Sequence, residues 1–235
     1  MSNKYFRFKQ FIVRQERCAM KVGTDGVLLG AWTTMPAAVS RILDIGTGTG
    51  LIALMAAQRA PAATVDAVEI EEEAASQAAD NIAESPWSDR VRVHTVAIQK
   101  FEPEYRYGVI VSNPPYFSRS LKNESLKKSI ARHNDALPSC DLAASVSRLL
   151  EDDGIFAAIL PYEEAAVLIA EAAGHGLYLH RRLDVHGRRG KPVKRVLMEF
   201  RRQPAFRLVS ERMHLENEDN TRSKAYSELT ADFYL

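Results

Sequence analysis

The segment Asp44-Ile45-Gly46-Thr47-Gly48-Thr49-Gly50 constrains the fold more than any other part of this sequence. It follows the apolar stretch 41–45, which is typical of a buried strand, and precedes the Ala-, Leu- and Met-rich stretch 51–60, which is typical of a helix ended by a proline. Glycines at a strand–helix connection permit positive φ angles and let the backbone approach a ligand closely. In a doubly wound α/β sheet, ligands bind at such a connection. The segment therefore predicts an α/β fold with a ligand crevice beside the glycines.

Strand and helix signals alternate through most of the remaining chain. Further strands are predicted at 64–69, 91–96, 107–112 and 155–160, and further helices at 71–84, 137–150 and 162–173. Repeated alternation gives a doubly wound, mostly parallel sheet with helices on both faces. Residues 177–185 and 193–201 have no helix between them, so they predict an antiparallel hairpin at the end of the sheet.

This pattern divides the chain into three parts. Residues 1–40 form an N-terminal extension that we expect to contribute to the site, through a glycine turn and a brief helix after residue 23. We expect residues 41–207 to form the α/β domain that contains the ligand crevice, and residues 208–235 to form a polar C-terminal tail. A chain of 235 residues has the size of one such domain.

The composition points to a globular protein of a reducing compartment. No run of 18 or more apolar residues and no signal peptide is present, so we expect a cytoplasmic protein without a membrane partner. Cys18 and Cys140 match no metal or redox spacing, so no metal is expected. The oligomeric state is left open.

The net charge of +1 hides a strongly basic stretch near the C-terminal hairpin. Residues 181–207 include ten Lys and Arg residues but only two acidic residues, Asp184 and Glu199. Such segregation of charge favours a polyanion partner on one face. The candidates for backbone-phosphate contacts are Arg188, Arg189, Lys191, Lys194 and Arg195.

The tetrapeptide Asn113-Pro114-Pro115-Tyr116 follows the predicted strand 107–112 and indicates a specific chemistry. Two consecutive prolines fix the backbone and bias Asn113 towards an extended conformation. The Asn113 side-chain oxygen and the Pro114 carbonyl can then accept both N–H bonds of a flat amine, while the Tyr116 ring covers one face. Phe117 is a candidate wall of the same pocket.

The spacing of the glycines discriminates between cofactors. A dinucleotide fingerprint would need its third glycine at position 51, which is leucine, and the Gly-Lys-Ser/Thr of a P-loop is absent. Glu69 ends the second strand, where an acid can bond to ribose hydroxyls. An acid before the first glycine suits an ammonium group, so S-adenosylmethionine fits this pattern. The candidate cofactor contacts here are Asp44, Gly46, Thr47, Gly48, Gly50 and Glu69.

These motifs resemble class I S-adenosylmethionine-dependent methyltransferases, a Rossmann-like fold class, that modify planar amino nitrogens. Within this class the chain resembles the bacterial tRNA1(Val) adenine-N6 methyltransferases, which act on the adenosine 3′ to the anticodon. The stretches 8–14, 21–30, 131–133 and 185–187 carry the closer resemblance.

The resemblance implies direct methyl transfer to the N6 amino group of an adenosine in tRNA. It implies that Asn113, Pro114 and Tyr116 act in catalysis, and that no general base is required. Further cofactor contacts are expected from Lys21, Thr24, Asp25 and Asn113, and further RNA contacts from Tyr116, Phe117 and Arg132.

One departure concerns the cofactor's adenine. The family type commonly places an aspartate after the third strand to meet the adenine amino group, but this chain has Ala97 or Ile98 there. We expect a backbone group or Gln99 to hold the adenine instead.

Several alternatives share part of this pattern. A protein glutamine-N5 methyltransferase and an rRNA N-methyltransferase use the same Asn-Pro-Pro-Tyr chemistry, although the former carries a larger N-terminal helical domain. A DNA adenine methyltransferase would need a target-recognition region for which the chain has no room. A non-catalytic RNA-binding module would not need the glycine loop, Glu69 and Asn113.

Overall fold

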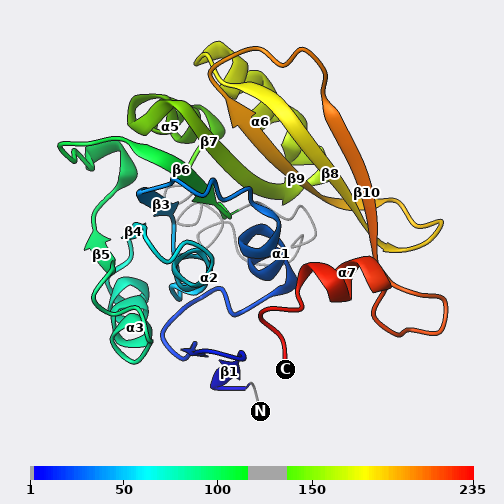
Figure 1. The fold of residues 1–235 in the computed structure, drawn as a ribbon, viewed down its shortest axis with the longest axis horizontal. Coiled ribbons are helices and arrows are strands. Elements are labelled where there is room, and N and C mark those ends of the chain that lie inside the picture. The colour runs from blue at the N-terminus through cyan, green and yellow to red at the C-terminus, as the bar shows by residue number, and fades with distance from the viewer. Residues whose placement is uncertain (1–2, 116–136) are drawn as a thin grey trace, which may run out of the picture.

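The computed structural model describes residues 3–115 and 137–235, and its centre is an eight-stranded sheet (Figure 1). The strand order is β10-β8-β9-β7-β6-β3-β4-β5. All neighbours pair in parallel except β9, which is antiparallel to both β7 and β8. The strands of this sheet are β3 (Arg41–Ile45), β4 (Thr64–Glu69), β5 (Val91–Thr95), β6 (Tyr107–Ser112), β7 (Leu150–Pro161), β8 (Tyr178–Arg188), β9 (Val193–Arg201) and β10 (Val209–Glu216).

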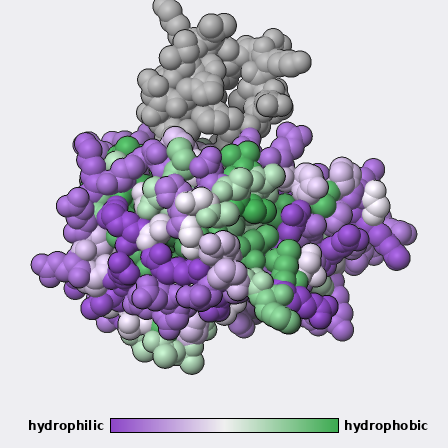
Figure 2. All heavy atoms as spheres, turned by 90° about the horizontal axis from the view of Figure 1, so that it is seen from above, coloured by the Kyte–Doolittle hydropathy of each residue, from purple (hydrophilic) through white to green (hydrophobic). Residues whose placement is uncertain are grey.

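Helices cover both faces of the sheet. They are α1 (Thr24–Trp32), α2 (Leu51–Arg59), α3 (Glu72–Ala83), α5 (Ser139–Leu149), α6 (Tyr162–Gly174) and α7 (Lys224–Leu229), with the short 3-10 turn η1 (Ile98–Lys100). One hydrophobic core contains residues of α1, α2 and α3, and a second core contains residues of α5 and α6. Hydrophilic side chains cover most of the face seen in Figure 2, and hydrophobic ones gather in a smaller area. The predicted doubly wound, mostly parallel sheet with an antiparallel hairpin is confirmed.

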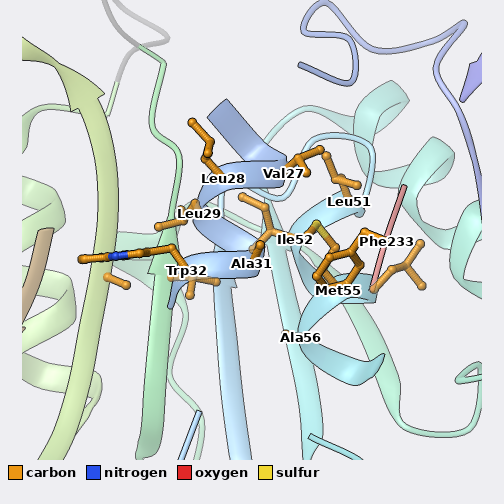
Figure 3. Packing of buried hydrophobic residues seen from close by; sticks show 14 of the residues in the cluster. Val27, Leu28, Leu29, Ala31, Trp32, Leu51, Ile52, Met55, Ala56 and Phe233 are labelled. Atoms are coloured by element: carbon orange, nitrogen blue, oxygen red, sulfur yellow. The ribbon is translucent and has the colours of Figure 1, made fainter. Parts of the chain in front are cut away.

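Close packing of α1 on α2 fixes the N-terminal part of the chain beside the glycine segment (Figure 3). A Cβ atom on Gly30 would meet the Met55 sulfur at 2.7 Å, and one on Gly26 would meet Leu51 at 3.0 Å. Glycine at these positions therefore lets the two helices approach. The Phe233 ring, which is buried, packs into the same core near Met55.

The two chain ends contain strands and a helix that were not predicted from the sequence. Strands β1 (Tyr5–Arg7) and β2 (Ile12–Arg14) form a separate antiparallel hairpin. Within the stretch 208–235, β10 pairs with β8 at the edge of the main sheet and α7 follows it. The division at residues 40 and 207 stays a prediction.

Strand β7 is longer than the predicted strand 155–160. It begins at Leu150, directly after α5, and includes the sequence Asp152-Asp153-Gly154. Leu150 pairs with Tyr107 and Ile155 pairs with Val109, so residues 151–154 form an irregularity in the pairing of β6 with β7. Regular pairing with β6 therefore begins at Ile155, where the predicted strand begins.

Candidate functional site

The carboxyl ends of the central strands bring three segments of the chain together. Ile45 at the end of β3 pairs with Val68 of β4 on one side and with Ser112 of β6 on the other. The buried Ser112 hydroxyl also donates a hydrogen bond to the Ile45 carbonyl, at 2.9 Å. The residues that follow these three positions are therefore neighbours in space, and they are Gly46, Glu69 and Asn113.

A cavity of about 540 Å³ opens above these strand ends. Its size lies within the range of small-molecule and cofactor sites. The wall is built by residues 18–26, 45–49, 68–71, 96–99 and 112–115, together with Leu51, Ile52, Ala74 and Leu137.

Most of the predicted cofactor contacts line this cavity. Those that do are Lys21, Thr24, Asp25, Gly46, Thr47, Gly48, Glu69 and Asn113, joined by Pro114. Asp44 and Gly50 lie outside the wall, as do all five basic residues predicted to contact phosphate. Tyr116, Phe117 and Arg132 lie outside the described residues.

The glycine segment turns with three left-handed residues. Gly46, Gly48 and Gly50 have φ angles of 71°, 56° and 82°, which residues with a side chain rarely adopt. The amides of Gly46 and Thr47 donate to the Val68 carbonyl at 2.8 and 3.1 Å, which fixes the turn on β4. Cβ atoms on Gly46 and Gly48 would meet nothing within 4 Å. The turn therefore leaves open space for a ligand against its backbone.

Asp44 lies beneath this turn and holds it in place. Its buried carboxylate accepts from the Thr47 hydroxyl at 2.6 Å and from the Ala53 amide, in the first turn of α2, at 3.1 Å. Burial raises the pKa of Asp44 from 3.8 to about 7, against the opposing effect of these two hydrogen bonds. Its second oxygen, Oδ1, has no hydrogen-bond partner among the described residues. Whether Asp44 meets the cofactor stays a prediction.

Glu69 places a fixed carboxylate at the edge of the cavity. Its Oε2 accepts from the Gly48 amide at 2.9 Å, and its Oε1 accepts from the amides of Ile70 and Glu71 at 2.9 and 3.1 Å. Each carboxylate oxygen has more than one lone pair, so capacity remains for hydroxyl donors. The carboxylate thus joins the glycine turn to the end of β4.

Asn113 lines the same cavity and has an unused hydrogen-bond acceptor. Its Oδ1 is buried and has no hydrogen-bond partner among the described residues. Its amide nitrogen lies 4.0 Å from the sulfur of Met20, a side chain that sequence reasoning missed. A buried acceptor without a partner is costly, and such groups mark places where a ligand supplies the missing donor. The buried Pro114 follows directly in the wall.

The N-terminal wall of the cavity is a loop closed by the side chain of Gln15. The Gln15 side chain, 5% exposed, accepts from the Val22 amide at 2.8 Å and donates to the Asn3 carbonyl at 2.8 Å. Arg17 anchors the loop to α3 through Ser76 and Asp80. This loop has no periodic pattern of apolar residues, so only its glycine turn could be predicted from the sequence.

Asp25 and Arg195 form an ion pair at the edge of the cavity. The Arg195 Nε atom lies 2.6 Å from an Asp25 carboxylate oxygen, and both side chains are less than a third exposed. Arg195 pairs with Pro161 at the carboxyl end of β7, so the ion pair connects the hairpin to the start of α1. The sequence suggested separate cofactor and phosphate roles for these two residues, whereas the structure brings them together.

The other basic candidates lie on the hairpin outside the cavity. Arg188 bonds to Glu216 at 2.9 Å and to Asn220. The side chains of Arg189, Lys191 and Lys194 are exposed around the turn between β8 and β9. Because Arg195 pairs with the end of β7, this turn lies at the same edge of the sheet as the cavity.

The cavity wall after β5 has no acid at residues 96–99, where the resemblance led us to expect one. Ala97, Ile98 and Gln99 all line the cavity. The Gln99 side-chain nitrogen donates to the Asp141 carboxylate on α5, at 3.1 Å. Sequence reasoning named Gln99 but had no signal for Asp141, which lies 42 residues away.

No group of three or more His, Cys, Asp or Glu residues in 3–115 and 137–235 is placed to hold a metal ion. Across the same residues, no helix combines the length and apolar character needed to cross a bilayer.

Comparison with known proteins points in one direction. A family model described as "Methyltransferase small domain" matches residues 24–138. The chain is 46% identical to the tRNA1(Val) (adenine(37)-N6)-methyltransferase of Phocaeicola vulgatus, over 100% of this chain and 99% of the relative. The fold is similar to a predicted O-methyltransferase from Agrobacterium tumefaciens, with a TM-score of 0.67, 20% identity, and 89% and 96% of the two chains covered. It is also similar to a glycopeptide N-methyltransferase solved with S-adenosylmethionine, with a TM-score of 0.55, 17% identity, and 78% and 100% covered.

Proposed function

The chain belongs to the tRNA1(Val) (adenine(37)-N6)-methyltransferase family, and from this premise we propose that it transfers a methyl group to N6 of adenine 37 in tRNA1(Val). One structural observation supports the reaction most directly. The unpartnered, buried Asn113 Oδ1 lies in the wall of a cavity that also contains the glycine turn. An acceptor in that position suits an exocyclic amine.

The cofactor is S-adenosylmethionine, which supplies an electrophilic methyl group. The residues present fit this molecule. The open backbone of Gly46 and Gly48 would lie against its amino-acid part, and the Glu69 carboxylate would accept hydrogen bonds from its ribose hydroxyls. Lys21, Thr24 and the rest of segment 18–26 would close the opposite wall.

Asn113 and Pro114 would orient the target amine. The lone pair of an aromatic amine is delocalised into the ring, so the group is a weak nucleophile. Acceptance of its two N–H bonds by Asn113 Oδ1 and the Pro114 carbonyl would hold the nitrogen at the methyl donor, and positioning of this kind lowers a barrier substantially. The same oxygens would stabilise the positive charge that develops on nitrogen.

Proton loss needs no dedicated base in this scheme. The methylated nitrogen becomes strongly acidic and releases its proton after the new bond forms. The role of Asn113 is therefore acceptance and not proton abstraction, since a neutral amide is not a base at physiological pH.

The tRNA would approach across the hairpin edge. An anticodon loop is single-stranded, so a base can leave its stack at low cost and enter a pocket. Arg189, Lys191 and Lys194 are exposed at this edge and are proposed to contact backbone phosphates, together with Arg188. Arg195 is proposed instead to hold α1 through Asp25. Such a substrate supports a cytoplasmic location for the enzyme.

The test is methyl transfer to several acceptors side by side. Purified protein with labelled S-adenosylmethionine is offered unmodified total tRNA, total rRNA and release-factor protein, and digested RNA is mapped for the modified nucleoside. We expect N6-methyladenosine at position 37 of tRNA1(Val). Labelling of rRNA or of a glutamine in the protein, with tRNA unlabelled, would overturn the assignment.

A further inference from the structure

The missing acid after β5 leaves the adenine of the cofactor without its usual acceptor. Ala97 and Ile98, which occupy the expected place, have only hydrocarbon side chains and cannot accept a hydrogen bond. The cavity wall continues through Gln99, two residues beyond Ala97. The exposed Gln99 side chain is therefore the next polar group along this wall.

The carboxylate of Asp141 on α5 fixes the orientation of the Gln99 side-chain amide. Its nitrogen donates to Asp141 Oδ2 at 3.1 Å, and the other carboxylate oxygen accepts from the Cys140 thiol at 3.6 Å. Only the NH2 end of an amide can donate to a carboxylate, so the Gln99 oxygen is left as an acceptor. Asp141 lies in the first turn of α5, where the helix dipole stabilises a negative charge. Asp141 does not line the cavity and can act only through Gln99.

We propose that Gln99 accepts a hydrogen bond from the exocyclic amino group of the cofactor's adenine, and that Asp141 is the positioning residue that orients the Gln99 amide. In this arrangement the hydrogen-bond acceptor for the adenine lies on η1, at Gln99, and the carboxylate that orients it lies on α5, at Asp141. The inference rests on the proposed function, because it requires an adenine-containing cofactor in this cavity.

The experiment measures discrimination between two ligands by calorimetry on the full-length protein. One ligand is S-adenosylhomocysteine, and the other is its analogue in which hydrogen replaces the 6-amino group of the purine. A single hydrogen bond corresponds to a preference of about five- to tenfold for the amino form in the unaltered protein. In Gln99→Ala the preference should fall to about one, because the acceptor is gone.

Two further variants separate this role from general damage to the site. Lys100→Ala is the matched control, since Lys100 lies on the same turn η1 but outside the cavity wall, and it should keep the full preference. Asp141→Ala should lose the preference as well, because the Gln99 NH2 group then has no acceptor on α5 that fixes the orientation of the amide. Adding Ala97→Asp to Gln99→Ala should restore the preference, because a carboxylate then stands at the family position.

The outcomes distinguish the inference from its premise. Full discrimination in Gln99→Ala, with binding otherwise intact, would overturn the role of Gln99. Full discrimination in Asp141→Ala would overturn the role of Asp141. Failure of the unaltered protein to bind either ligand would instead overturn the proposed function itself.

Discussion

The buried carboxyl of Asp44 should make the stability of this enzyme depend on pH in a specific direction. Its pKa is raised from 3.8 to about 7 in the fold, so the folded protein binds this proton more tightly than the unfolded chain does. Stabilisation from a raised carboxyl pKa is fully present at low pH and is lost as the pH rises from about 4 to about 7. Each unit of pKa difference corresponds to about 1.4 kcal/mol, so the loss between pH 5.5 and pH 7 is about 2 kcal/mol.

The measurement compares urea unfolding of the unaltered protein with that of Asp44→Asn, which does not titrate, at about pH 5.5 and about pH 8.5. Contributions from other groups cancel in the difference between the two proteins. The stability advantage of the aspartate protein should shrink by about 2 kcal/mol at the higher pH. Asp219→Asn is the control, because the pKa of the exposed Asp219 is lowered by hydrogen bonds from Thr221, and its difference should stay constant. A constant difference for Asp44→Asn as well would show that the carboxyl is already ionised at pH 5.5, and would refute the reasoning.

Three further predictions concern the cavity and the hairpin. Gly48→Ala should cost about 1–2 kcal/mol of stability and weaken cofactor binding in calorimetry, because its φ of 56° is strained for alanine; unchanged affinity would mean that the cofactor does not need this backbone. Arg195→Ala should raise the KM for S-adenosylmethionine more than it alters tRNA binding; the reverse would return Arg195 to a phosphate contact. Joint replacement of Arg189 and Lys191 by alanine should lower the slope of log affinity for tRNA against log salt by about 2, whereas Lys224→Ala on α7 should leave it unchanged. Equal slopes in both variants would place the RNA elsewhere.

Much of the fold followed from local patterns in the sequence. The strands β3, β4 and β6 and the helix α2 lie within a residue of their predicted bounds, because each is a continuous apolar or helix-forming stretch with a clear stop signal. The proximity of the glycine turn, Glu69 and Asn113 could also be predicted, since the carboxyl ends of adjacent parallel strands meet at one edge of a sheet.

Other elements carry too little local signal to be read from sequence. Strands β1 and β2 are three residues long, which is too short for a period of two to be recognised. Strand β10 is mostly exposed at the sheet edge, and Glu211 interrupts the alternation of its apolar residues Val209, Met213 and Leu215 with polar ones. Its pairing with β8 depends on the rest of the sheet.

The site details that the sequence missed are contacts between distant residues. Asp25 and Arg195 are 170 positions apart in the sequence. The hydrogen bond between the Gln15 side chain and the Val22 amide depends on the fold of the loop that it closes. In the sequence, each of these residues could equally be an ordinary surface polar residue. Arg195 reaches Asp25 through the register of β9 against β7. Patterns of residue type therefore located the cavity, while tertiary pairing decided which side chains share it.

The role of Asn113 is tested most directly by single-turnover methyl transfer at saturating cofactor and tRNA, measured alongside the Kd of S-adenosylmethionine. Asn113→Ala should reduce the rate by about a hundredfold or more, because a preorganised acceptor for the developing charge is lost. The Kd should change little, since the glycine turn and Glu69 are untouched. A rate near that of the unaltered enzyme would contradict the account, because the unpartnered oxygen of residue 113 would then have no part in the reaction.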